Sequence, residues 1–250
     1  MAGHSHWAQI KRQKGTTDAR RGQLFSKLSK EISVAARMGG GDPGFNPRLR
    51  RAIESARAES MPIDKIERAV KKGLGELGGE TIEEIIYEGY GPGGVALLVE
   101  AATDNKNRTA AEVRALFSKH AGNLGGAGSV AWMFKKKGYF LIENATEEEV
   151  FEAALNAGAE EVQKEENGVS VVCSFDQFDT LDKALKAANF QVSAAKAIYV
   201  AENLVPIPTI ETARSLLHLI DQLEANDDVQ HVYDNYDISP DFWAQLDAGS

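Results

Sequence analysis

The chain has 250 residues, of which 43% are hydrophobic and 26% are charged, a balance that excludes a wholly disordered protein and fits two or three small domains. No apolar run approaches the roughly 18 residues that a membrane-spanning helix needs, and the first residues lack a secretory signal pattern, so we expect a cytoplasmic protein. The single cysteine, Cys173, lies in an apolar run, which excludes an internal disulfide and predicts a small buried side chain on a strand.

Charge is distributed unevenly along the chain. Residues 1–75 carry 16 basic and 7 acidic side chains, a net charge of +9, whereas residues 76–250 carry 12 basic and 30 acidic ones, a net charge of −18. This asymmetry indicates that one region meets a polyanion such as nucleic acid while the rest does not. The plainer alternative is a solvated basic surface, and charge alone does not decide between the two.

The first 78 residues predict a basic arm followed by a three-helix bundle. Residues 1–21 show no apolar period and are expected to form an extended or mobile arm. Apolar residues at helical spacing predict a helix from Gly22 to the glycine-rich stretch at residues 39–44, and Asn46 with Pro47 marks the start of a second. A third is expected from about Pro62 to Gly73, with Ile63, Ile66, Ala69 and Val70 facing inward.

The following residues alternate between short strands and helices. Strands are expected at 82–87, 95–102 and 130–134, with a helix at 109–120 that is capped by Asn107. Residues 139–200 then read strand, helix, strand, strand, helix, strand, which is the order of a ferredoxin-like unit. A helix at 210–223 and a strand at 229–237 remain, and the simplest arrangement returns them to the sheet that begins at Ile82.

The predicted fold class is therefore α+β and multidomain, with an N-terminal three-helix bundle and two α/β domains, the third domain being ferredoxin-like and inserted into the second. The expected boundaries are 1–78 for the basic arm and helical domain, 79–136 plus 204–250 for a discontinuous α/β domain, and 137–203 for the inserted domain.

No pattern in the sequence supports an enzyme. Gly89–Gly94 matches G-x-G-x-x-G, but it precedes a predicted strand instead of a helix, so we interpret it as a hairpin or bulge. The five histidines lack metal-ligand spacing, no serine lies in a nucleophile elbow, and the acidic residues fall in runs typical of solvated faces. We expect no catalytic residue, cofactor or functional metal. If Met1 is removed, the amine of Ala2 and the imidazole of His4 could form an incidental square-planar Cu(II) or Ni(II) site.

Basic side chains in the first 75 residues are the candidate nucleic-acid ligands. Those of the arm accompany Trp7, whose indole can stack on a base. Three arginines lie in the first turns of the second helix, where positive charge opposes the macrodipole, and a local rule broken without structural benefit points to function. The candidates are His4, Trp7, Lys11, Arg12, Lys14, Arg20, Arg21, Lys27, Arg48, Arg50 and Arg51. Lys106 and Arg108 form a weaker second candidate, since helix capping by Asn107 accounts for most of that segment.

Several strings, in order, resemble the YebC/PmpR family and cover nearly the whole chain. They are Met1–Trp7, Ile10-Lys11, Arg21-Gly22, Leu24–Leu28, Phe45–Arg50, Tyr87–Val95, Thr103–Asn105, Asn107–Thr109, Gly122–Gly125 and Asp227–Gln230. The resemblance implies three domains, the first helical and the others α/β, and a transcriptional regulator that binds DNA. It implies no catalytic residues. The family's amino-terminal motif falls on His4, Trp7 and Lys11, and its Asn-Pro-Arg motif on Asn46, Pro47, Arg48 and Arg50.

Two functions follow as hypotheses. The leading one is a non-enzymatic, DNA-binding transcriptional regulator. Other members of the family are described as translation factors, so the alternative is a ribosome-associated protein whose partner is ribosomal RNA. Phosphate contacts are common to both and carry no sequence information, so the sequence leaves DNA and RNA open.

Overall fold

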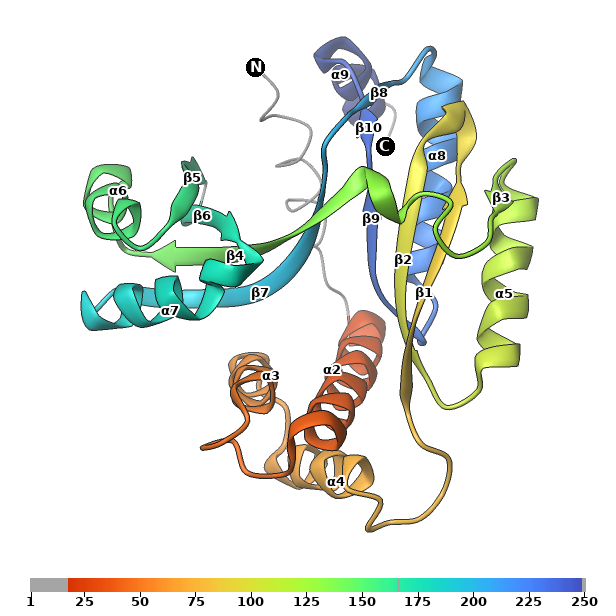
Figure 1. The fold of residues 1–250 in the computed structure, drawn as a ribbon. Coiled ribbons are helices and arrows are strands. Elements are labelled where there is room, and N and C mark those ends of the chain that lie inside the picture. The colour runs from red at the N-terminus through yellow and green to blue at the C-terminus, as the bar shows by residue number, and fades with distance from the viewer. Residues whose placement is uncertain (1–17, 166, 249–250) are drawn as a thin grey trace. The chain divides into compact units, whose positions relative to one another are not determined.

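The computed structural model describes residues 18–165 and 167–248. The chain divides into two compact units, Met1–Met133 with Ala201–Ser250, and Phe134–Val200, so the second unit is an insertion in the first (Figure 1). The fold is mixed α/β with an N-terminal helical region, which confirms the predicted fold class. Within the described ranges, no helix is both long and apolar enough to cross a membrane.

Three helices form the start of the first unit: α2 (Asp18–Gly39), α3 (Pro47–Ala58) and α4 (Ile63–Gly73). We call residues 18–73 the helical region. As predicted, Asn46 caps α3, because its side chain accepts a hydrogen bond from the backbone N–H of Leu49 at 3.0 Å and Pro47 occupies the first turn. A core of buried aliphatic side chains that includes Ile32, Leu49 and Ile66 holds the three helices together.

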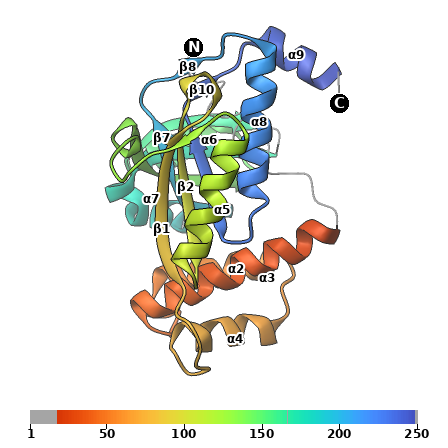
Figure 2. The ribbon, with the colours of Figure 1, turned by 90° about the vertical axis from the view of Figure 1, so that its right-hand side faces the viewer.

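The remainder of the first unit is built on an antiparallel sheet in the order β3-β1-β2-β9. Its elements are β1 (Glu83–Tyr90), β2 (Ala96–Thr103), α5 (Lys106–Lys119), β3 (Asn123–Leu124), α8 (Ile210–Glu224) and β9 (Val229–Asp234). Helices α5 and α8 pack on the same face of β1 and β2, where Figure 2 shows them side by side. The C-terminal strand β9 pairs with β2, which confirms that the chain returns to the first sheet.

The second unit is a four-stranded sheet in the order β5-β6-β4-β7, with two helices packed on it. Its elements are β4 (Phe134–Glu143), α6 (Glu147–Leu155), β5 (Ala159–Glu165), β6 (Gly168–Ser174), η3 (Phe175–Gln177), α7 (Phe178–Ala187) and β7 (Gln191–Ala201). This order of strands is the ferredoxin-like arrangement that the sequence predicts. Cys173 is buried on β6, and burial raises the pKa of its thiol to about 11, so it is an inert core residue.

Several local predictions were wrong at element ends. Helix α2 begins at Asp18, four residues before the predicted start at Gly22, so Arg20 and Arg21 lie on a helix and not on the arm. Asn105, not Asn107, caps α5, since its side chain accepts from the N–H of Arg108 at 3.1 Å. Ile63 occupies the first position of α4 and is 64% exposed, whereas Met61 just before the helix is buried in its place.

The expected strand at 130–134 does not form. Instead, a short 3-10 turn, η2 (Ala131–Met133), precedes β4. The carboxylate of Glu88 on β1 accepts hydrogen bonds from the backbone N–H groups of Gly128, Val130 and Ala131 at 2.7–2.8 Å, and this takes up donors that a strand would use in its ladder. Burial alone would raise the pKa of Glu88, but these three hydrogen bonds lower it, so the carboxylate stays charged.

The sequence analysis also missed strand β8 (Val205–Pro206) and helix α9 (Pro240–Ala248), and the single strand expected at 229–237 is divided into β9 and β10 (Tyr236–Asp237), the second of which pairs in parallel with β8. The glycine-rich segment at residues 89–94 contains the 3-10 turn η1 (Pro92–Gly94), which joins β1 and β2 as a hairpin, and Gly93 has a positive φ of 77°. The rejection of a dinucleotide loop there is consistent with this geometry, because no helix begins after the glycines.

Close packing of α4 on α2 leads to a first prediction. A Cβ atom on Gly73 would lie 2.3 Å from the backbone oxygen of Ser33, so Gly73→Ala should push the two helices apart and lower the free energy of unfolding by about 2 kcal/mol. The matched control is Gly22→Ala on α2, where a Cβ meets no atom within 4 Å and where alanine should stabilise the helix by about 0.5–1 kcal/mol. Urea denaturation of both variants measures the difference, and equal stabilisation by both would contradict it.

Candidate nucleic-acid interface

The predicted arm ligands fall in two places. His4, Trp7, Lys11, Arg12 and Lys14 lie outside the described residues, as does the copper or nickel site at the amino terminus. Arg20 belongs to the first turn of α2, and Arg21 follows it with an exposed side chain whose guanidinium carbon lies 5.6 Å from the centre of the Phe25 ring. The sequence prediction for the arm therefore remains a prediction.

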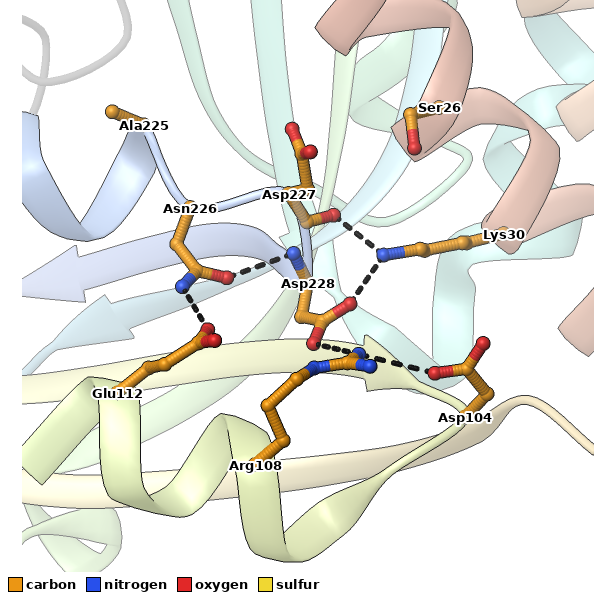
Figure 3. A pocket seen from close by; sticks show the side chains of 9 residues that line it. All are labelled: Ser26, Lys30, Asp104, Arg108, Glu112, Ala225, Asn226, Asp227 and Asp228. Carbon is orange, nitrogen blue, oxygen red and sulfur yellow. Dashed lines mark hydrogen bonds and ion pairs between the residues drawn. The ribbon is translucent and has the colours of Figure 1, made fainter. Parts of the chain in front are cut away.

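The densest polar site of the first unit surrounds Asp228, in the turn between α8 and β9. Its carboxylate is 7% exposed and accepts hydrogen bonds from four side chains, of which Figure 3 draws Lys30 and Arg108. The donors are Lys30 at 2.5 Å, Thr109 at 2.6 Å, Arg108 at 2.8 Å and Thr103 at 3.1 Å. We call these five residues the Asp228 cluster. They come from α2, β2, α5 and the α8–β9 turn, so one carboxylate connects the helical region to the sheet and its helices.

The electrostatics of the Asp228 cluster keep the carboxylate charged. Burial alone would raise the pKa of Asp228, but the hydrogen bonds from Arg108, Lys30 and Thr109 outweigh burial and hold the pKa well below its usual range. The same hydrogen bonds to Asp228 and Asp104 raise the pKa of Arg108. The buried charge is thus paired and fully hydrogen-bonded, the condition under which such a charge is tolerated.

Lys27, a predicted nucleic-acid ligand, caps helix α8. Its ammonium donates to the backbone oxygen of Glu224 at 2.8 Å, and Gln23 one turn earlier donates to that of Ala225 at 2.6 Å. Unpaired carbonyls at the C-terminal end of a helix carry partial negative charge, so a cation is favourable there. Burial is the main reason that the pKa of Lys27 is lowered. This lysine serves the junction between α2 and α8.

Arg48 has a structural role that the sequence analysis missed. Its guanidinium pairs with Glu31 at 2.8–2.9 Å and with Glu84 at 2.5–3.1 Å, which ties α2, α3 and β1 together. Burial alone would lower its pKa, yet the hydrogen bonds to the two carboxylates raise it. The premise that this first-turn arginine brings no structural benefit was therefore wrong, and its position against the macrodipole is compensated by two carboxylates.

The remaining candidates are also engaged to different degrees. Arg50 donates to the backbone oxygen of Pro43 at 3.2 Å, and both Arg50 and Arg51 are partly buried at the start of α3. Lys106 forms an exposed ion pair with Glu83. Because Arg108 belongs to the Asp228 cluster, the weaker second contact predicted for Lys106 and Arg108 falls on side chains that already have carboxylate partners.

An open pocket of about 590 Å³ borders the Asp228 cluster (Figure 3). Its lining residues are Ser26, Lys30, Asp104, Arg108, Glu112, Ala225, Asn226, Asp227 and Asp228. Four carboxylates outnumber the two cations in this lining, and both cations are paired with Asp228, so a phosphate would meet net negative charge. Its chemistry fits a polar junction and does not fit an anion site.

Exposed positive charge on α3 and α4 comes from residues that the sequence analysis did not single out. Arg57 on α3 and Lys65, Arg68 and Lys71 on α4 are exposed. Lys65 lies 5.4 Å from the centre of the Phe25 ring, so this ring is approached by two cations. The polar positions between the apolar ones of α4 are the signal that could have identified them. Arg57 and Lys71 also lie in last turns, where positive charge favours the helix.

The fold and this arrangement of the helical region match a known family. Residues 5–76 match the model of the TACO1/YebC protein N-terminal domain, and residues 82–236 match the model of the TACO1/YebC second and third domain. A conserved hypothetical protein from Aquifex aeolicus has a similar crystal structure, with a TM-score of 0.86 and 47% sequence identity over 94% of this chain and 97% of that chain.

Curated relatives agree with both matches. A probable transcriptional regulatory protein of Methylacidiphilum infernorum is 52% identical over 99% of this chain and 100% of its own length. Another of Geobacter sulfurreducens is 51% identical over 98% of this chain and 100% of its own length. The chain belongs to the TACO1/YebC family, which confirms the resemblance seen in the sequence.

The Asp228 cluster generates a second prediction. Asp228→Ala removes the only carboxylate shared by Lys30 and Arg108 and should lower the free energy of unfolding by about 2–3 kcal/mol, less than for a wholly buried pair because Arg108 is half exposed. Asp227→Ala is the control, since its side chain is exposed and its backbone oxygen still accepts from Lys30; it should change stability by about 0.5 kcal/mol or less. Chemical denaturation tests this, and equal effects of both variants would contradict it.

A third prediction concerns pH. The pKa of Asp228 is lowered in the folded protein, so its contribution to stability is complete above the unfolded-state pKa of about 3.9 and declines as the pH falls from there towards the folded-state pKa. The stability difference between the natural protein and Asp228→Asn should therefore be constant from pH 7 to about pH 5 and shrink below about pH 4. Denaturation at each pH measures it. A difference that stays constant down to pH 3 would show that the carboxylate's charge is not the stabilising property.

Proposed function

We propose that this chain is a cytoplasmic, non-enzymatic transcriptional regulator that binds DNA through its basic N-terminal part. The main observation that supports this proposal is the charge asymmetry: the net charge is +9 in residues 1–75 and −18 in residues 76–250. A duplex carries about one negative charge per 1.7 Å of its axis, so only the N-terminal part offers a favourable surface to it. The relatives named probable transcriptional regulatory proteins support the transcriptional side of the proposal.

Internal ion pairs narrow the set of side chains on which this proposal rests. Lys27, Arg48 and Arg108 have partners within the first unit, so they orient the helical region and are weak candidates for phosphate contacts. Lys11, Arg12 and Lys14 of the arm, Arg20 and Arg21 at the start of α2, and Arg50 and Arg51 of α3 remain the proposed ligands. The exposed cations of α3 and α4 add further positive charge to the N-terminal part.

A fourth prediction tests the proposal. Replacing Lys11, Arg12, Lys14, Arg20 and Arg21 by glutamine should weaken DNA binding strongly, and the slope of log affinity against log salt should become shallower by about 0.9 per lost contact on a duplex. The free energy of unfolding should change by about 0.5 kcal/mol or less for each substitution if these groups are exposed ligands. The matched control neutralises five exposed cations of the acidic part: Arg114, Lys119, Lys164, Lys183 and Arg214. It should leave both the affinity and the slope near those of the parent.

Fluorescence anisotropy with duplex DNA, over a series of salt concentrations, gives both quantities. Trp7→Ala is a second control, because loss of stacking should lower the affinity while leaving the salt slope nearly unchanged. An unchanged slope in the folded five-residue variant would contradict the proposal. Recovery of ribosomal RNA instead of promoter DNA after crosslinking in cells would replace DNA by RNA as the partner.

A further inference from the structure

Phe45 is the most exposed large hydrophobic side chain described, with 88% of its surface accessible to solvent. It lies in the short loop between α2 and α3. A single exposed hydrophobic residue is common on protein surfaces and by itself indicates no function. For Phe45, two further features indicate what the ring can bind: the anchored loop that carries it and the arginines near it in the sequence.

The loop holds Phe45 in a defined position. On one side, the backbone oxygen of Asp42 accepts hydrogen bonds from the backbone N–H groups of Phe45 and Asn46 at 3.2 and 2.9 Å. The carboxylate of Asp42 accepts a hydrogen bond from the backbone N–H of Gly44 at 2.7 Å. On the other side, the buried side chain of Asn46 donates to the backbone oxygens of Ala35 and Gly40 at 2.7 and 2.8 Å. Because the backbone of this loop is anchored, only the side-chain rotation of Phe45 has to be restricted when the ring binds a partner.

Arginines lie near this ring in the sequence, and one of them, Arg48, is already paired with Glu31 and Glu84. Residues 37–51 contain four arginines and a single acidic residue, Asp42, whose carboxylate is engaged in the loop. The guanidinium of Arg50 donates to the backbone oxygen of Pro43, so it lies against the same loop as Phe45. An exposed aromatic face beside a guanidinium matches a nucleotide, since the ring can stack on the base and the cation can pair with the phosphate.

We propose that Phe45 is a base-stacking residue, whose ring packs on an unpaired or locally unstacked base of bound DNA while Arg50 contacts the adjoining phosphate. This rests on the proposed nucleic-acid-binding function and adds to it the residue that reads the base face. Because every base has such a face, the contact strengthens binding to exposed bases without selecting a sequence. A protein partner would gain less from the site, since the arginines beside the ring favour a polyanion.

The test uses the full chain and single-stranded DNA oligonucleotides that carry 2-aminopurine, whose fluorescence is quenched by stacking. Phe45→Ala should weaken binding about tenfold, the effect expected from the loss of one stacked base, and should abolish the quenching contributed by the ring. Phe45→Trp should keep the affinity and the quenching within about threefold of the parent, because tryptophan retains an aromatic face. Phe45→Leu should behave like alanine. The salt slope should not change in any of the three, since no phosphate contact is removed.

The control variant is Phe151→Ala on α6, where the phenylalanine is 48% exposed in the acidic part of the chain, and it should bind as the parent does. Parental affinity of Phe45→Ala, while the five-residue arm variant loses binding, would overturn the stacking proposal and leave the proposed function intact. Equal binding by the leucine and tryptophan variants would also overturn it, because an apolar contact would then suffice. A parent protein that binds no nucleic acid would remove the proposed function itself, and ring dependence seen with RNA alone would overturn DNA as the ligand.

Discussion

The ionised carboxylate of Asp228 is the interaction on which the first unit depends. It is almost wholly buried and receives hydrogen bonds from α2, from the end of β2 and from α5, through residues that lie 119 to 198 positions away from it in the sequence. Apolar burial between α2 and the sheet is small and involves Val34, Ile82 and Ala102. A non-directional apolar contact of this size would leave the helical region free to shift, whereas four directed hydrogen bonds to one carboxylate fix its orientation.

The basic residues of the N-terminal part fall into an internal group, which is paired within the first unit, and an external group, which is exposed. Lys27, Lys30 and Arg48 point into the first unit and pair with carboxylates or helix carbonyls. Arg57, Lys65, Arg68 and Lys71 are exposed on α3 and α4. The internal group determines where the external group is presented, because it joins α2 to α8 and to β1. Under the proposed function, a substitution in the internal group would thus alter nucleic-acid binding through orientation, which is why stability and affinity have to be measured together.

Local rules in the sequence were sufficient for much of the fold. The Asn46–Pro47 cap, the order of the inserted unit and the return of β9 to the first sheet follow from capping chemistry, apolar period and the need to pair a leftover strand. Two of the failures, the strand expected at 130–134 and the role of Arg48, share one physical cause, which is a long-range polar contact. Glu88 replaces a strand ladder at residues 128–131, and Glu31 with Glu84 accounts for Arg48. A count of charges locates a basic region but cannot tell a paired cation from an exposed one.

Under the proposed function, the acidic remainder of the chain limits how the protein can bind DNA. The protein has a net charge of −9, so DNA repels it while the distance between them is large compared with the distance between its basic and acidic parts. Attraction begins only when the basic part lies closer to the DNA than the acidic part does. At physiological ionic strength the screening length is about 8 Å, so the two parts act on a nearby strand almost independently. Under the proposed function, non-specific sliding is therefore weak, and affinity depends on contacts made within that distance by the arm and the helical region. The long-range attraction that most basic DNA-binding proteins use is partly cancelled here by the acidic part. Short-range contacts that salt does not screen, such as a stacked aromatic ring, therefore contribute a larger share of the binding free energy.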